Sequence, residues 1–121
     1  MGLFDLTDLV VERSLAGASQ RQEVLANNLA NANTAGFKRS DVDFESSLAS
    51  ALGSGNPAAA VAGVSFQPKV DNASPTQADG NNVNMETEMS GLTENAVEYE
   101  TLTEIEKNRM AMLSSAIGGG A

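Results

Sequence analysis

The chain has 121 residues, enough for one domain. Its 16 acidic and 7 basic residues give a net charge of −9, which argues against nucleic acid as a partner, because binding phosphates requires clustered lysine and arginine. Cysteine and histidine are absent, which excludes disulfides and thiolate metal sites and removes the commonest general base. We therefore expect no cofactor, no metal site and no catalytic residues, so the chain is not expected to be an enzyme.

Hydrophobicity is spread thinly along the chain. Apolar residues make up 41% of it, but many are alanines, and the aromatic residues are four phenylalanines and one tyrosine. Small side chains each bury little area, at ~25 cal/mol per Å². No apolar run reaches the ~20 residues that span a bilayer, and residues 1–8 lack the basic start of a cleaved secretion signal. We expect a marginal monomer without a transmembrane segment, which partners would stabilise.

Residues from about 3 to 33 carry the repeat of a long amphipathic helix. Apolar or small residues alternate at spacings of four and three, which is typical of a coiled-coil or bundle seam. The seam consists of Phe4, Val11, Leu15, Ala18, Gln22, Leu25, Leu29 and Ala32, and its only polar positions are Asp8 and Gln22. A single helix packed on an ordinary core would show the same periodicity.

Asparagines gather at the end of this helix, where they cost more than alanine would. We expect the amides of Asn27, Asn28 and Asn31 to bond to neighbouring chains; the alternative is that they only fray the helix. Asn33 and Gly36 are expected to end it, because both residue types accept the left-handed conformation of a helix stop.

The helical spacing of apolar residues is absent between about residues 38 and 79. Residues 41–45 alternate like a short strand or extended arm, residues 46–52 suit one or two helical turns, and residues 64–70 suit a short edge strand containing Pro68. Between them, a segment rich in glycine and serine leads into the alanine run of residues 58–63, which is expected to be a flexible loop.

A second long helix is predicted from Met85 to Ile117, with Asn84 as its N-cap and glutamates in its first turn. Its seam consists of Met85, Met89, Leu92, Ala96, Tyr99, Met110, Leu113 and Ile117. No charged residue follows Arg109. The end of this helix is therefore expected to be buried in an assembly, the alternative being a frayed tip.

The expected fold is mainly α. Long N- and C-terminal helices pair as an antiparallel, coiled-coil-like hairpin, with an irregular middle rich in alanine, glycine and serine and with possible short β segments. Residues 1–36 form the N-terminal helix and turn, residues 37–80 the loop or extended middle, and residues 81–121 the C-terminal helix. Together they make one axial domain.

The stretch Leu25–Lys38, which ends a leucine-, alanine- and asparagine-rich helix in a Thr-x-Gly-aromatic-Lys turn, resembles the N-terminal signature of bacterial flagellar rod, hook and hook-associated axial proteins. Residues 21–25, 41–44 and 79–83 are similar to the proximal rod members of that family. The resemblance covers residues 1–45 and 79–117. Ala35 stands where proline is common in the family, and Asn84 where aspartate is usual.

This resemblance implies a structural subunit of the basal-body rod. In that family the terminal helices pack against neighbouring subunits and form a tube around the export channel. The expected partners are copies of the chain, other rod proteins, an adaptor subunit of the basal-body ring and the type III export apparatus. The location implied is the periplasmic rod, reached without a cleaved signal. A soluble helical adaptor or export chaperone is the alternative function.

The seams and the helical asparagines define the expected assembly interface. Its residues are Val11, Leu15, Ala18, Gln22, Leu25, Asn28, Leu29, Asn31, Ala32, Met89, Leu92, Ala96, Tyr99, Met110, Leu113 and Ile117.

Overall fold

The computed structural model describes residues 3–118, and side chains within residues 6–118. Its elements, in chain order, are α1 (Leu3–Ala30), β1 (Ser40–Asp41), α2 (Phe44–Leu52), α3 (Pro57–Ala62), β2 (Lys69–Val70) and α4 (Met85–Gly118). None of the helices within the described range is long and apolar enough to cross a membrane.

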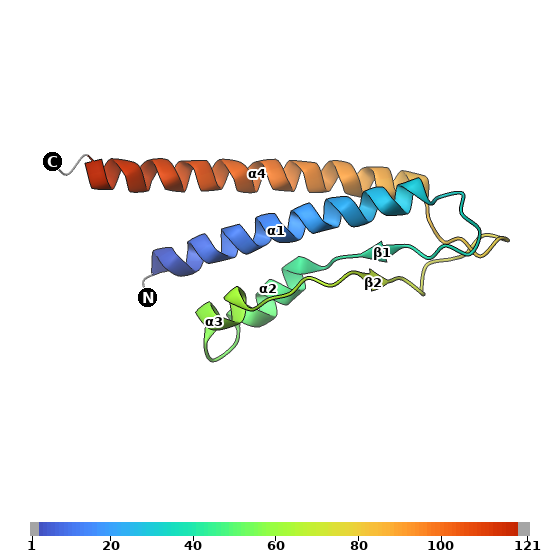
Figure 1. Cartoon of the computed structure of the whole chain (residues 1–121), viewed down its shortest axis with the longest axis horizontal. Helices are drawn as coiled ribbons and strands as arrows, with labels where there is room; N and C mark the ends of the chain where they lie inside the picture. Colours follow the sequence, from blue (N-terminus) through green and yellow to red (C-terminus); the bar gives the residue numbers. More distant parts are fainter. Residues whose placement is uncertain (1–2, 119–121) are drawn as a thin grey trace.

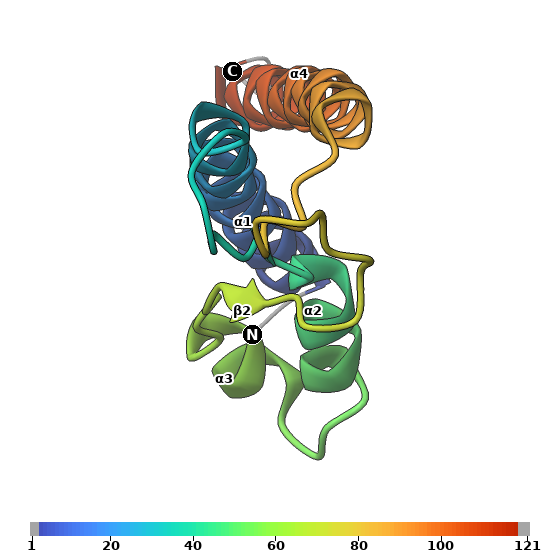
Figure 2. The same ribbon diagram turned by 90° about the vertical axis from the view of Figure 1, so that its right-hand side faces the viewer.

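The two long helices run antiparallel, as the sequence predicted, with α4 starting beside the end of α1 (Figure 1). The middle segment, residues 40–71, folds back along α1 on the side away from α4. Figure 2 shows the resulting three layers, with α4 on top, α1 in the centre and α2 and α3 below. We call residues 40–71 the arm. Because α1 lies between the arm and α4, it is the helix around which the fold is organised.

Helix α1 ends through a series of turns. The amide of Ala32 donates to Leu29 O at 3.2 Å, and that of Thr34 to Asn31 O at 3.0 Å. Gly36 then adopts a φ of +74°, and its amide donates to Asp79 O at 2.8 Å. The left-handed conformation predicted for Gly36 is confirmed, but α1 ends at Ala30, before the predicted end near residue 33, because turns replace the last predicted helical residues. The left-handed conformation predicted for Asn33 is wrong, because positive φ values in the described chain occur only at glycines.

The arm is more regular than the sequence predicted. Asp43 caps α2, accepting from the Ser46 amide at 3.2 Å and from the Ser46 hydroxyl at 2.7 Å. The alanine run predicted as a flexible loop is helix α3 instead, since Asn56 caps it and Pro57 occupies its first turn, where proline favours a helix. The two strands are only two residues each, paired antiparallel with Ser40 opposite Val70. The strand predicted over residues 41–45 gives way to α2 at Phe44.

A hydrophobic core lies between the arm and α1. Its buried members are Ala18, Val42, Phe44, Leu48, Ala51, Val61 and Phe66. The rings of Phe44 and Phe66 meet edge to face, with centroids 6.0 Å apart. Gly17 lets Phe44 approach α1 closely, because a Cβ built at Gly17 would lie 2.5 Å from Cγ of that ring. The arm therefore supplies the chain with a core of its own, which the thin composition did not predict.

The contact between α1 and α4 is largely polar. Glu88 and Asn95, seven residues apart on α4, are the residues of that helix that are buried. Asn95 Nδ2 donates to Ala18 O and to Gln22 Oε1, both at 2.8 Å. The same spacing of seven residues continues along α4 through Leu102 to Arg109, whose Nε donates to Asp8 Oδ1 at 2.5 Å. Hydrogen bonds and ion pairs thus hold α4 on α1, beside apolar contacts of Leu25 with Gly91 and of Leu102 with the core.

Candidate assembly surface

The apolar residues of α4 lie on its outside. Met89, Tyr99, Met110, Leu113 and Ile117 have exposed fractions between 45% and 76%. Ala96 is exposed as well, and Leu92 is half-buried. We call Met89, Leu92, Ala96, Tyr99, Met110, Leu113 and Ile117 the apolar row. It is the seam that the spacing of four and three predicted, except for Met85, which is exposed as well. The apolar row lies beside the polar contact with α1, and most of its side chains are exposed and available to another chain.

Four predicted interface residues meet at one shallow groove of about 290 Å³ beside this row. Its walls are Ala18 and Gln22 of α1 and Ala96 and Tyr99 of α4, with Ser19 and Asn95 completing the lining. The small side chains of the two alanines leave a hollow between the helices. Such a hollow can receive one apolar side chain from a third helix, as in knobs-into-holes packing.

No element of the described part of the chain covers the C-terminal end of α4. Residues 110–118 are all exposed, and in Figure 1 the two long helices diverge toward this end, where α4 extends past α1. Met110, Leu113 and Ile117 thus form an apolar, uncharged tip with exposed fractions of 59%, 50% and 76%. A contiguous exposed apolar surface of this kind marks an interaction site in a soluble protein.

Other predicted interface residues are used inside the chain. Those that are buried are Val11, Ala18, Leu25, Asn28 and Ala32. Leu15, Gln22 and Leu29 of α1 are half-buried, as is Asn31 in the turn that follows it. A polar substitution at a buried member such as Leu25 would therefore disturb the fold of the single chain. Clean tests of assembly need the exposed residues of α4.

Asn28 binds within its own chain rather than to a neighbour. It is 1% exposed, its Nδ2 donates to Ser40 O at 2.7 Å, and its Oδ1 accepts from the Ser40 amide at 3.0 Å. The same Nδ2 donates to Glu88 Oε2 at 3.2 Å. Asn31 likewise bonds locally, its Nδ2 donating to Asn27 O at 2.8 Å. These amides join the end of α1 to β1 and to the start of α4.

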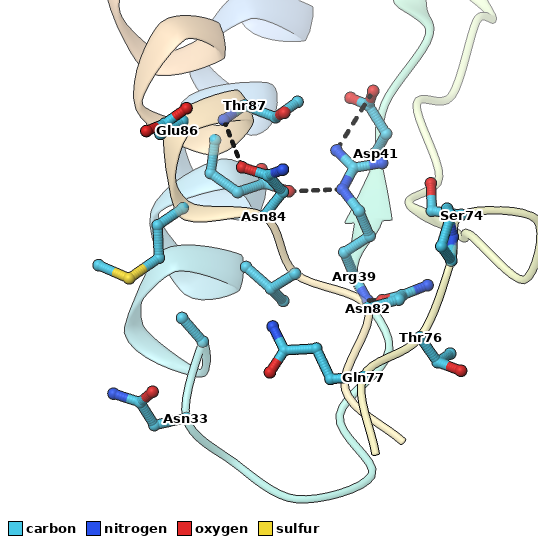
Figure 3. Close-up of a pocket in the computed structure, with 15 residues that line it drawn as sticks. Asn33, Arg39, Asp41, Ser74, Thr76, Gln77, Asn82, Asn84, Glu86 and Thr87 are labelled. Atoms are coloured by element: carbon cyan, nitrogen blue, oxygen red, sulfur yellow. Dashed lines mark hydrogen bonds and ion pairs between the residues drawn. The ribbon is translucent and has the colours of Figure 1, made fainter. Parts of the chain in front are cut away.

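Arg39 completes this junction. Figure 3 shows its side chain, from the residue just before β1, extending toward α4, where its Nε donates to Glu88 Oε1 at 2.5 Å. Its Nη1 donates to Asp71 Oδ2 at 3.1 Å. The Glu88 side chain has no exposed surface, so this is a buried ion pair satisfied by two donors, Arg39 and Asn28. The side-chain bond to Glu88 raises the pKa of Arg39 against the opposing effect of burial.

Asp71 and two asparagines tie the loop before α4 to the same junction. The Ser74 hydroxyl and amide, the Ala73 amide and Arg39 all bond to the carboxylate, which holds the pKa of Asp71 well below its usual range. Asn82 Nδ2 donates to Asp71 O at 2.6 Å, while Asn82 Oδ1 accepts from the Arg39 amide at 2.7 Å. The predicted cap of α4 is confirmed nearby, since Asn84 Oδ1 accepts from the Thr87 amide at 3.2 Å.

The junction forms one side of an open cleft of about 850 Å³ (Figure 3). Its lining includes Gln77, Thr76 and Asn84 beside Arg39. No group of three or more acidic side chains within residues 3–118 is arranged to hold a metal ion. The burial of Glu88 and Asn95, and the ion pair of Glu88 with Arg39, were not predicted from the sequence. The spacing of seven residues between Glu88 and Asn95, which places both on one face of α4, was the signal that could have indicated their burial.

Comparison with known proteins agrees with the resemblance carried by the first helix. Residues 10–38 match the family model described as flagella basal body rod protein. The flagellar basal body rod protein FlgB of Aeromonas hydrophila is 32% identical, over 96% of this chain and 96% of that protein. FlgB of Bacillus subtilis (strain 168) is 29% identical over 99% of each chain, and FlgB of Escherichia coli (strain K12) is 33% identical over 68% of this chain and 71% of its own. The chain therefore belongs to the family of FlgB-type flagellar basal body rod proteins.

Proposed function

We propose that this rod protein is a structural subunit that polymerises through α1 and α4 into the tubular proximal rod around the export channel. Its neighbours would be copies of itself, other rod proteins and a ring adaptor subunit. It would reach the periplasm through the type III export apparatus. The role is structural rather than catalytic, in keeping with relatives that are named as rod proteins.

The observation that carries this proposal is the orientation of α4. The helix turns Glu88, Asn95 and Arg109 toward α1 and leaves Tyr99 and Leu113 in water. In a protein that works alone, the apolar stripe of a helix normally faces the core. Covering this row with a neighbouring chain would remove apolar area from water at ~25 cal/mol per Å². Assembly therefore supplies burial that the fold of one chain leaves out.

Substitutions in the exposed tip test the proposal without disturbing the monomer. We expect Met110→Ser combined with Leu113→Ser to leave the unfolding free energy within about 0.5 kcal/mol of wild type, because both side chains are exposed. The variant should be exported but absent from isolated basal bodies, and its strain should not swim. Leu52→Ser is the matched control, since Leu52 is an exposed leucine on α2, outside the apolar row. Normal incorporation of the tip variant would contradict the proposal.

A soluble adaptor or export chaperone is the second candidate, favoured by the core between the arm and α1, which would let a single chain fold in solution. The two functions differ in where the protein ends up. A rod subunit would remain in basal bodies after detergent extraction and washing. An adaptor would be recovered with the soluble fraction and would release its client reversibly.

A further inference from the structure

A second groove, of about 580 Å³, follows the other flank of the helix pair. It shares only Asn95 with the apolar groove described above. Its acidic lining residues are Asp41 and Glu45 of the arm and Glu86, Glu94 and Glu98 of α4. We call this the acidic groove. One flank of the helix pair is thus apolar, and the other is dominated by carboxylates.

The positively charged side chains that line the acidic groove already form ion pairs within the chain. Arg21 and Arg39 are its basic lining residues among those described. Arg21 donates to both oxygens of Glu45 and to Val42 O, and its guanidinium lies 4.5 Å from the centre of the Phe44 ring. Arg21 also forms longer ion pairs with Asp41 and Glu98, at 3.7 and 3.8 Å. Arg39 is bonded to Glu88 and Asp71 outside the groove and lies 3.8 Å from Asp41 inside it. Two guanidiniums are therefore shared among more carboxylates than they can neutralise.

Two further observations point to a missing cationic donor. Asn95 is 2% exposed, and its Oδ1 is a buried acceptor without a hydrogen-bond donor. A buried amide oxygen normally has a partner, so a donor entering the groove would satisfy it. Burial, and secondarily the neighbouring charge of Glu45, raises the pKa of Glu98 against the opposing effect of Arg21, so Arg21 alone does not offset the loss of water and the nearby carboxylate.

We infer that the acidic groove binds a lysine- or arginine-bearing segment of a different protein. This inference rests on the proposed function, because it assigns a partner class to one flank of a rod subunit. A cationic side chain would neutralise Glu94 and Glu98 and could donate to Asn95, and opposite charges of this kind give an interface its specificity.

A second copy of the chain matches this groove less well than a basic segment does, because it has few lysines or arginines to offer. Of the seven basic residues, five are bonded within the chain, namely Arg13, Arg21, Lys38, Arg39 and Arg109. A copy could therefore offer Lys69 and Lys107 without breaking an internal bond. The occupant is consequently a basic partner, whereas copies of the chain meet through the apolar row.

A defined peptide tests this inference on the purified full-length chain. The probe is an alanine-based helical peptide with a lysine at every fourth position, and its control carries glutamine in place of lysine. Calorimetry at low ionic strength should detect binding of the lysine peptide alone. Replacing Glu94 and Glu98 by glutamine should weaken that binding about fivefold, as expected for the loss of two partly exposed ion pairs. Added salt should weaken it further.

The matched control replaces Glu100 and Glu104, two exposed glutamates of α4 outside the groove, by glutamine. This variant has the same net charge as the groove variant and should bind the peptide like wild type. Equal weakening in both variants would reveal only general attraction to an acidic protein and would overturn the inference. Absence of peptide binding at low salt would overturn it too.

The two proposals fail separately. The tip variant Met110→Ser/Leu113→Ser keeps the acidic groove intact and should bind the lysine peptide normally, even though it is not expected to enter the rod. Suppose that the tip variant is incorporated normally and that, of the two glutamine variants, only the one at Glu94 and Glu98 loses peptide binding. The proposed mode of polymerisation is then wrong, while the inference of a basic partner in the acidic groove still holds.

Discussion

Replacing Gly17 by alanine sets two opposing effects against each other. Alanine is favoured over glycine within a helix by ~1 kcal/mol. However, the new Cβ would lie 2.5, 2.6 and 2.9 Å from Cγ, Cβ and Cδ2 of Phe44. These atoms form the base of a buried ring, so they cannot yield by rotating a flexible end. Overpacking of this kind costs ~1–3 kcal/mol, and three contacts below 3.0 Å place this site toward the upper value.

We therefore expect Gly17→Ala to lower the unfolding free energy by about 1–2 kcal/mol, and the melting temperature by roughly 4–8 °C for a chain of this size. Gly91→Ala is the matched control, because a Cβ there would first meet Leu25 Cδ1 at 3.2 Å, the movable end of a side chain. This control should be neutral or up to ~1 kcal/mol more stable. Urea unfolding followed by circular dichroism measures both. A Gly17→Ala variant as stable as Gly91→Ala would refute the close packing of the arm on α1.

Three further predictions concern the junction and the tip. Arg39→Met should cost about 3 kcal/mol in urea unfolding, because it leaves the Glu88 carboxylate buried without its cation; a loss below 1 kcal/mol would argue against a buried pair. Hydrogen bonds to Ser74 and Arg39 lower the folded-state pKa of Asp71. The stability it contributes is therefore complete above its unfolded-state pKa, near 4, and is lost as the pH falls toward the folded-state value. Unfolding free energies measured between about pH 6 and pH 3 should decline less steeply in Asp71→Asn than in wild type, and equal slopes would exclude this role. In the isolated chain, amides of residues 110–118 should exchange with solvent faster than those of residues 88–95, since no layer covers the tip; uniform protection along α4 would contradict the structure.

The long helices could be predicted because their evidence is local. The spacing of apolar residues and the side chain of Asn84 indicated α4 from Met85, and the structure agrees. The periodic spacing also predicted which residues form the apolar row. It did not predict which way the row faces, because periodicity places residues on one face of a helix without showing what that face contacts.

The arm could not be predicted because its order depends on distant contacts. Helix α3 is a short alanine run whose stability comes from its Asn56 cap, Pro57 and the burial of Val61 against the rest of the core. Phe44 and Phe66 lie 22 residues apart in sequence, and nothing local indicates that their rings meet. The buried pair of Arg39 and Glu88 joins residues 49 positions apart, so the junction became visible only in the structure.

Assembly of the proposed rod buries the apolar row of α4, and a thiol placed in this row would report that burial directly. The chain contains no cysteine, so Leu113→Cys introduces a unique thiol at the exposed tip. The measurement is its rate of maleimide labelling in the isolated chain and in purified basal bodies, with denatured samples as the reference for complete reaction. We predict rapid labelling of the isolated chain and strong protection in the basal body. Equal labelling in both states would show that the tip stays in water, and the account of assembly through α4 would be wrong.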